Sequence, residues 1–203
     1  MIHIPKHFRK TAKPLTLLAI IASLAVVSAC GDPQSREIES LQREAWKQPG
    51  DASSWFRLGN AHARNQEYRK AEEAYRKALE LDPALENLMP ALGAASFNQG
   101  NYSEALGYFK KHQEQAPDDS LRNYDLGNAF MQMKRYPEAI AAYKRAIANS
   151  VSFNEAYYNL GVCYARTGRS AEAKEIYEVL VRKNNYLAVS LKNHVDRTDS
   201  AGE

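Results

Sequence analysis

The chain of 203 residues has few cysteines and none of the short motifs that mark common catalytic sites. Its two cysteines allow at most one disulfide and cannot form a cysteine-rich zinc site. No H-E-x-x-H, G-x-S-x-G, P-loop or G-x-G-x-x-G pattern occurs. Without a convergent set of titratable residues, the sequence predicts no enzyme, no metal site and no cofactor, and it gives no support to a small-ligand carrier.

A surplus of positive charge is also lacking once the first 29 residues are set aside. Those residues include Lys6, Arg9, Lys10 and Lys13 and no acidic residue, which leaves 23 basic and 24 acidic residues in the remainder. Nucleic-acid binding needs an excess of Lys and Arg on one face, so no nucleic-acid partner is expected. A hydrophobic content of 44% with 25% charged residues is typical of a folded domain.

Residues 1–29 have the three parts of a signal peptide. A basic stretch is followed by an almost continuous apolar run from Leu15 to Val27 and then by small residues. The run is shorter than the ~20 residues that a comfortable bilayer span requires. A cleaved signal peptide is therefore predicted, and an uncleaved signal anchor is the weaker alternative.

The run ends in Val27-Ser28-Ala29-Cys30, which resembles the bacterial lipobox. The resemblance implies that the Cys30 thiol receives a diacylglycerol through a thioether, that cleavage follows Ala29, and that the new amino group is acylated with a chain such as palmitate. It also implies a short tether over residues 30–35. It places the chain in the cell envelope, and we expect the outer membrane, facing the periplasm, rather than the inner membrane. The alternative is an ordinary secretory signal with a chance cysteine after it.

Three kinds of residue recur every 34 positions in the rest of the chain. They are the pairs Leu58-Gly59, Leu92-Gly93, Leu126-Gly127 and Leu160-Gly161, the alanines Ala71, Ala105, Ala139 and Ala173, and the aromatics Tyr75, Phe109, Tyr143 and Tyr177. This period and content resemble the tetratricopeptide-repeat (TPR) family. The resemblance covers 52–187 in four repeats, 52–85, 86–119, 120–153 and 154–187.

The resemblance implies an all-α, right-handed superhelical solenoid in which each repeat is two antiparallel helices, A and B. The recurring Gly and Ala are expected to let the two helices approach closely, and the recurring aromatic is expected to fill the space between repeats. Residues 36–51 are predicted to hold an extra N-terminal helix over 36–48. Residues 188–203 are predicted to hold a polar tail and most of a capping helix over 186–197, since solenoid ends need covering.

In the family, five positions of helix A line a concave groove that binds peptides. Carried onto this sequence, they are Phe56, Asn60, Arg64, Asn87, Ala94, Phe97, Asn98, Tyr124, Asn128, Met131, Gln132, Tyr158, Val162 and Arg166. Amides can pair with a peptide backbone, and the aromatic residues and Met supply apolar contact area. Some of these aromatics are alternatively interpreted as packing between neighbouring A helices.

The family's carboxylate clamp for acidic C-terminal tails needs Lys at the fifth position of helix A. Here that position holds Phe56, Pro90, Tyr124 and Tyr158, so no such clamp is expected. Pro90 should bend or shorten the start of its helix.

The isolated histidines and the second cysteine are interpreted as packing residues. His62 takes an aromatic position of helix A, His112 takes a small-residue position of helix B, and Cys163 aligns with alanines. We therefore expect neither a metal ligand nor a nucleophile among them.

The sequence thus predicts a non-enzymatic scaffold or assembly factor, anchored to a membrane through Cys30, with a protein or peptide partner in the groove. Its combination of lipobox and repeats is similar to lipoproteins that assemble type IV and tight-adherence pili, which suggests a pilus or secretion machinery. The alternative is an adaptor that docks peptidoglycan enzymes. A homodimer is left open.

Overall fold

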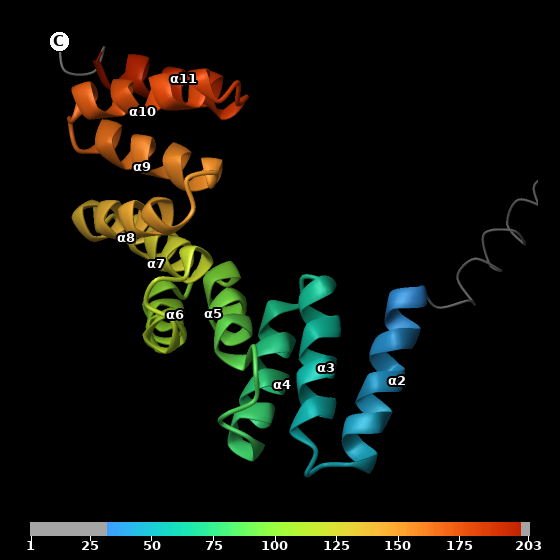
Figure 1. Cartoon of the computed structure of the whole chain (residues 1–203). Coiled ribbons are helices and arrows are strands. Elements are labelled where there is room, and N and C mark those ends of the chain that lie inside the picture. Colours follow the sequence, from blue (N-terminus) through green and yellow to red (C-terminus); the bar gives the residue numbers. More distant parts are fainter. Residues whose placement is uncertain (1–31, 200–203) are drawn as a thin grey trace, which may run out of the picture.

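The computed structural model describes residues 32–199, which fold into ten α-helices and no strands (Figure 1). The helices are α2 (Pro33–Lys47), α3 (Ala52–Arg64), α4 (Tyr68–Leu81), α5 (Leu88–Asn98), α6 (Tyr102–Gln115), α7 (Ser120–Gln132), α8 (Tyr136–Asn149), α9 (Asn154–Arg166), α10 (Ser170–Arg182) and α11 (Leu187–Asp199). The predicted all-α class is confirmed. None of the helices within 32–199 is long and apolar enough to span a bilayer. Cys30, the signal peptide and the last four residues lie outside the described part.

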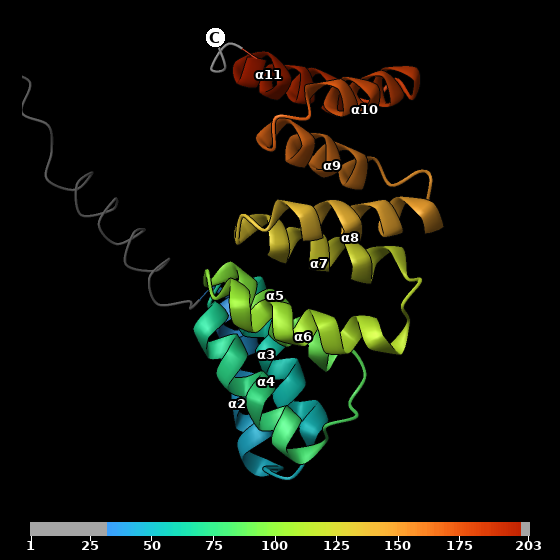
Figure 2. The same cartoon turned by 90° about the vertical axis from the view of Figure 1, so that its left-hand side faces the viewer.

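Eight of these helices form four antiparallel pairs, α3/α4, α5/α6, α7/α8 and α9/α10, with α2 before them and α11 after them. Each B helix packs on the A helix of its own pair and on the A helix of the next. Figure 1 shows α3, α5 and α9 bordering the inside of a bent array. Figure 2, turned by 90° from that view, shows the B helices α6, α8 and α10 in front.

The turn inside each pair has the same backbone geometry. One residue in each turn has positive φ. The backbone N–H of the residue that follows it donates, at 2.9 Å, to the carbonyl five positions earlier, in the last turn of helix A. The positive-φ residues are Gln66 (60°), Gly100 (82°), Lys134 (57°) and Gly168 (72°). Such a left-handed residue ends an α-helix and satisfies its last carbonyls, so the next helix starts antiparallel to the first.

The second A helix is the one that departs from this regularity. Helix α5 has 11 residues, against 13 in α3, α7 and α9. Asn87 precedes it in the left-handed region at φ 63°, and Pro90 lies in its first turn. The shortening expected from Pro90 is confirmed.

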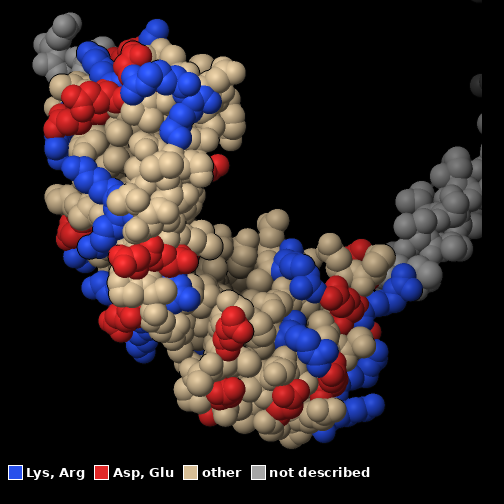
Figure 3. Space-filling view, in the orientation of Figure 1, with Lys and Arg blue, Asp and Glu red and all other residues tan. Residues whose placement is uncertain are grey.

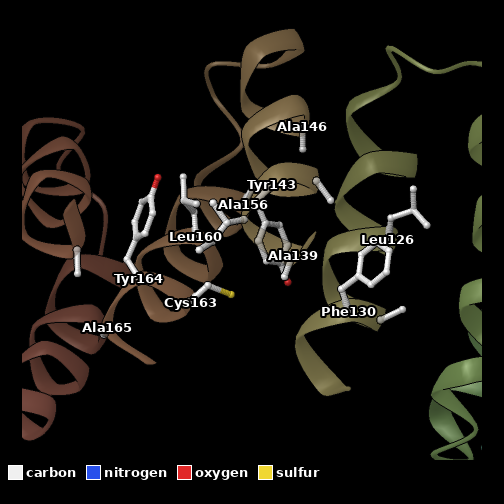
Figure 4. Close-up of a cluster of buried hydrophobic side chains, with 14 of the residues drawn as sticks. Leu126, Phe130, Ala139, Tyr143, Ala146, Ala156, Leu160, Cys163, Tyr164 and Ala165 are labelled. Atoms are coloured by element: carbon white, nitrogen blue, oxygen red, sulfur yellow. The ribbon is translucent and has the colours of Figure 1, made fainter. Parts of the chain in front are cut away.

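The recurring Leu-Gly pair and the recurring aromatic meet inside a pair of helices. A methyl group on Gly59, Gly93 or Gly127 would lie 2.4–2.5 Å from the ring of Tyr75, Phe109 or Tyr143, respectively. Only glycine permits this approach, because real Cβ contacts are never so short. In Figure 4 the Tyr143 ring lies between Leu126 and Phe130 on one side and Leu160 and Cys163 on the other, and it is fully buried.

The fourth repeat closes differently from what the 34-residue pattern predicts. A methyl group on Gly161 would meet Leu191 of α11, at 2.5 Å, and Ile176, not the aligned aromatic Tyr177. Helix α11 packs closely against α9 as well as α10, whereas the A helices of the other pairs barely touch one another. The expectation that Tyr177 repeats the role of Tyr143 is therefore wrong, because the capping helix supplies an aliphatic side chain in its place.

Substituting Gly127 by Ala tests the contact between helix backbone and ring. We expect the free energy of unfolding to fall by about 1–3 kcal/mol, because the added methyl group displaces a ring with no free space around it. Urea denaturation followed by circular dichroism measures the change. The control is Gly107→Ala in α6, where a methyl group meets nothing within 4 Å. This control should raise the free energy of unfolding by about 0.5–1 kcal/mol, and equal losses in both variants would contradict the contact model.

Candidate binding groove

The predicted groove residues lie on the A helices, which border a hollow between the two arms of the array. Figure 3 shows this hollow in space-filling form, with few charged side chains on its inner wall. Asn60 and Arg64 lie on α3, Phe97 and Asn98 on α5, and Tyr124, Asn128 and Met131 on α7. Tyr158 and Arg166 lie on α9. The surface is therefore assembled from four helices, each of which supplies a short row of side chains.

Two groove asparagines are fixed by tyrosines that cross from the B helices. The Tyr75 hydroxyl donates to Asn60 Oδ1 at 2.7 Å, and the Tyr143 hydroxyl donates to Asn128 Oδ1 at 2.8 Å. Burial raises the pKa of Tyr75 to about 12, and it raises the pKa of Tyr143 further, so both hydroxyls keep their proton. Each amide therefore presents its oxygen to the tyrosine, and its Nδ2 group is left to face away from it.

The amide of Asn128 receives a second hydrogen bond from the next repeat. Asn159 Nδ2 donates to Asn128 Oδ1 at 3.0 Å and to the Tyr124 hydroxyl at 3.3 Å. The Asn128 amide also forms a hydrogen bond with the Tyr124 hydroxyl, which occupies one of its two N–H groups, whereas within residues 32–199 Asn60 Nδ2 has no hydrogen-bond acceptor. Both side chains are half-buried, so Asn60 Nδ2 and the second N–H group of Asn128 are left for solvent or a partner.

The second and fourth repeats lack this arrangement. In the second repeat Ala94 replaces the asparagine and Phe109 replaces the tyrosine. Both the donor hydroxyl and the acceptor amide of this hydrogen bond are therefore absent from that repeat. In the fourth repeat Val162 stands at the asparagine position. At this repeat position, helices with an oriented amide therefore alternate with helices that carry an apolar side chain.

The groove aromatics are partly engaged with neighbouring rings. Phe56 lies 5.6 Å from Tyr75, Phe97 lies 5.2 Å from Tyr102, and Tyr158 lies 6.2 Å from His194, between ring centroids. Tyr124 is the most enclosed, with Phe153 at 4.6 Å and Tyr143 at 5.8 Å. All four groove aromatics are half-buried. Both interpretations made from the sequence therefore hold in part: one side of each ring packs, and the other remains accessible.

The other predicted groove residues differ in how free they are. Met131 is half-buried with its Sδ 3.7 Å from the Tyr143 hydroxyl, and the Asn98 amide donates to the Ala94 carbonyl at 2.8 Å. Arg64 forms an ion pair with Glu37 of α2 at 2.5 Å, so its charge is already matched. Arg166 is exposed in the last turn of α9.

Sequence reasoning missed one position of helix A that lies next to the groove. Asn159 occupies the sixth position of its repeat and bonds residues 31 and 35 positions earlier in the chain. The same repeat position holds Asp125 in α7. The available signal was the period itself, because three of the four residues at this repeat position, Arg57, Asp125 and Asn159, are polar.

Asp125 has an unusual environment for a carboxylate. Burial, with a smaller contribution from the negative charge of Asp119, raises the pKa of Asp125 from 3.8 to about 6. Within residues 32–199 no donor forms a hydrogen bond or an ion pair with it. The charged carboxylate therefore destabilises the folded chain.

The residues interpreted as packing residues lie in or against the core. His62 is buried and its Nδ1 lies 2.6 Å from Glu67 Oε2. The nearby Lys70 and His62 lower the pKa of Glu67 to about 2. His112 is half-buried. Cys163 is fully buried, and burial raises the pKa of its thiol to about 12, so it is not a nucleophile at neutral pH.

Two other hollows lie at the N-terminal end of the array. One of about 570 Å³ is an open depression beside residues 66–70, and one of about 410 Å³ lies between α2, α3 and α4, where Trp46 meets Trp55. Neither gathers a set of converging catalytic side chains. Within the described residues no group of three or more His, Cys, Asp or Glu is arranged to hold a metal ion.

Substituting Asp125 by Asn tests the unpaired carboxylate. In the unfolded chain this side chain ionises near pH 4, and in the folded chain near pH 6, so wild-type stability falls as the pH rises between them. Above about pH 6 the variant should be more stable than wild type by about 2 kcal/mol, and below about pH 4 the two should match. Thermal denaturation across this range measures the difference. The control, Glu175→Gln, removes an exposed carboxylate from α10 and should change little.

Models of the tetratricopeptide repeat match residues 52–85, 86–110 and 124–188. Among solved structures, the chain is similar to MamA from Desulfovibrio magneticus RS-1, at 19% identity over 90% of this chain and 97% of MamA, with a TM-score of 0.68. It is also similar to YrrB, described as a TPR protein with an unusual peptide-binding site, at 20% identity over 79% of this chain and 93% of YrrB, with a TM-score of 0.59. At these identities the likeness shows the fold alone.

Two peroxisomal proteins also match part of the chain. The peroxisomal targeting signal receptor of Saccharomyces cerevisiae is 30% identical over 108 residues, which are 52% of this chain and 18% of the receptor. Peroxisome biogenesis protein 5 of Arabidopsis thaliana is 32% identical over 101 residues, 45% of this chain and 14% of that protein. This chain thus spans less than a fifth of the length of each relative. The chain belongs to the tetratricopeptide-repeat family, and its array of helix pairs is a non-catalytic scaffold for protein–protein interaction.

Proposed function

We propose that this chain is a lipid-anchored scaffold of the bacterial envelope that holds an extended segment of a partner protein in its concave groove, in the assembly of a pilus or secretion machinery. The observation that carries the groove part of the proposal is the fixed orientation of Asn60 and Asn128. Each amide oxygen is held by a tyrosine hydroxyl, which leaves an N–H group for an outside acceptor. Backbone carbonyls of an extended peptide are acceptors of this kind.

The rest of the groove fits the same type of ligand. Phe56, Phe97, Tyr124 and Tyr158 supply partly accessible apolar faces on successive A helices. Their packing holds them in place before a ligand arrives, which lowers the entropic cost of binding. Among the groove residues predicted from the sequence only Arg64 and Arg166 are charged, and Arg64 is paired with Glu37. A segment bound here would be recognised by backbone and apolar contacts first.

The anchor part of the proposal rests on the sequence around Cys30. The apolar run and the Val27-Ser28-Ala29-Cys30 pattern support lipidation of Cys30 and a location at the outer membrane, facing the periplasm. Helix α2 begins at Pro33, three residues later. At ~3.3–3.6 Å per residue the connection reaches only about 10 Å, so a lipid on Cys30 would hold the array close to the membrane. A homodimer stays a prediction.

Substituting Asn128 by Asp tests the groove with little disturbance of the fold. Aspartate keeps an acceptor for Tyr143 and Asn159 but lacks the outward-facing N–H group. We expect partner capture to fall by about 10-fold or more, because an acceptor of the partner would then face a negative charge. The measurement is photo-crosslinking in the source cell from a benzophenone amino acid at Gln132, which is exposed on α7. Mass spectrometry then identifies the adduct.

The matched control is Asn101→Asp, which places the same charge at an exposed turn before α6. It should leave the adduct at the wild-type level. A secretin, pilin or secretion component in the adduct supports the assembly role. A peptidoglycan enzyme in the adduct would replace that role by a docking function, and an adduct unaffected by Asn128→Asp would place the partner outside the groove.

Substituting Cys30 by Ser tests the anchor. Without the thiol no thioether to diacylglycerol forms, so labelling with a palmitate analogue should be lost and the protein should leave the mature membrane fraction. Metabolic labelling and fractionation measure both effects. The control is Cys163→Ser, which retains Cys30 and removes only the buried thiol of α9. Unchanged labelling and fractionation of Cys30→Ser would rule out the lipid anchor.

A further inference from the structure

Asp125 stands at a repeat position whose polar side chains otherwise reach back to the preceding helix of the array. In the fourth repeat Asn159 bonds Asn128 and Tyr124 of α7. In the first repeat Arg57 bonds Glu44 of α2. Asp125 has no such bond to any residue within 32–199. Asp125 therefore occupies the same repeat position as Arg57 and Asn159 but lacks their hydrogen bond to a preceding helix.

The repeat register explains why the partner is missing. The residues 31 and 35 positions before Asn159 are Asn128 and Tyr124; the same offsets from Asp125 give Ala94 and Pro90. Neither Ala94 nor Pro90 has a side-chain donor. The nearby Asn98 amide is turned away from this role, because its Nδ2 donates to the Ala94 carbonyl at 2.8 Å. Ala94 is exposed, so the space opposite Asp125 opens toward the groove.

The charges around Asp125 do not neutralise it. Asp119 adds negative charge and raises its pKa together with burial. Burial raises the pKa of Tyr124, hydrogen bonds from Asn128 and Asn159 oppose this rise, and the negative charges of Glu155 and Asp125 add to it. The basic side chain of Arg122, on the same helix, donates to the His112 carbonyl at 2.5 Å. The local field at this point of the groove is therefore negative.

We propose that Asp125 is a specificity-determining residue of the groove and that it accepts the ammonium or guanidinium group of a Lys or Arg in the bound segment. The inference rests on the proposed function, in which the groove holds a peptide. Because the aligned Asn159 bonds the preceding A helix, the repeat register places Asp125 between α5 and α7. The oriented amides of Asn60 and Asn128 lie on α3 and α7. The segment is then bound through backbone carbonyls at those amides and through one basic side chain at Asp125.

The energetic consequence favours a basic residue over a neutral one. A half-buried carboxylate without a protein partner is partly desolvated without compensation, and together with the negative charge of Asp119 this raises the pKa of Asp125 to about 6. An ammonium or guanidinium group restores both a hydrogen bond and a compensating charge, and such charge-assisted bonds are stronger than neutral ones. A Glu in the same place of the bound segment would face Asp119, Asp125 and Glu155 together.

The experiment is a selection from a phage-displayed library of random peptides on the immobilised full chain in detergent micelles. It is run in parallel on wild type, Asp125→Asn and Asn128→Asp. We expect wild type to enrich peptides with Lys or Arg at one fixed position and Asp125→Asn to lose that enrichment. Glu175→Gln, which removes an exposed carboxylate from α10, is the control for net charge and should select the same peptides as wild type. Circular dichroism checks that each variant is folded.

A double-mutant cycle then separates a direct contact from an indirect effect. A selected peptide and its variant with norleucine in place of Lys are measured against wild type and Asp125→Asn. Removing the charge should weaken binding to wild type by about 10-fold and should leave binding to Asp125→Asn unchanged.

The outcomes distinguish this inference from the function on which it rests. Selected peptides whose binding depends on Asn128 but which carry no basic residue would overturn the role of Asp125 and leave the groove as the binding site. A double-mutant cycle that shows no coupling energy between Asp125 and the Lys of the peptide would do the same. A selection that yields no peptide sensitive to Asn128→Asp would overturn the groove and this inference together.

Discussion

The close approach of an aromatic ring to a glycine backbone is the contact on which both the fold and the groove depend. In the first and third pairs the ring of Tyr75 or Tyr143 rests on Gly59 or Gly127, where no other residue fits. The same side chain extends past the glycine, and its hydroxyl reaches an asparagine on the groove side of helix A. One residue thus joins two helices by packing and orients a binding group by a hydrogen bond. Groove geometry in this array follows directly from core geometry.

The second pair shows that the two roles are separable. Phe109 keeps the ring on Gly93, but it has no hydroxyl, and the groove residue that would have received one is Ala94. Packing is therefore preserved in three successive pairs, while polarity in the groove alternates between them. At the ninth position of the repeat, the four A helices present in turn an amide, an apolar side chain, an amide and an apolar side chain. This order gives the groove a direction and a register, which a uniform surface would not.

Most of the fold could be predicted from the sequence because its determinants are local and periodic. The Leu-Gly pairs, alanines and aromatics specify helix pairs without reference to distant parts of the chain, and Pro90 identified the shortened α5. The role of Leu191 could not be predicted, because it depends on how α11 docks on α9 beyond the last repeat. The groove was predicted as a surface, but the roles of Asn159 and Asp125 were not. Those roles depend on which residues of neighbouring A helices face each other, which a single repeat does not show.

The unpaired carboxylate of Asp125 is hard to explain by folding alone. One repeat later, the same position holds Asn159, which donates hydrogen bonds to two acceptors on α7. A neutral side chain at position 125 would avoid the free-energy penalty of a buried charge. The repeat register explains the difference: the positions of α5 that correspond to the partners of Asn159 are Ala94 and Pro90, which have no side-chain donor, and the Asn98 amide donates to the Ala94 carbonyl. Strain or an unmet polar group that the fold does not need is commonly found where a protein meets its ligand. In the proposed binding mode, the oriented amides recognise a chain by its backbone and the Asp125 carboxylate selects among chains.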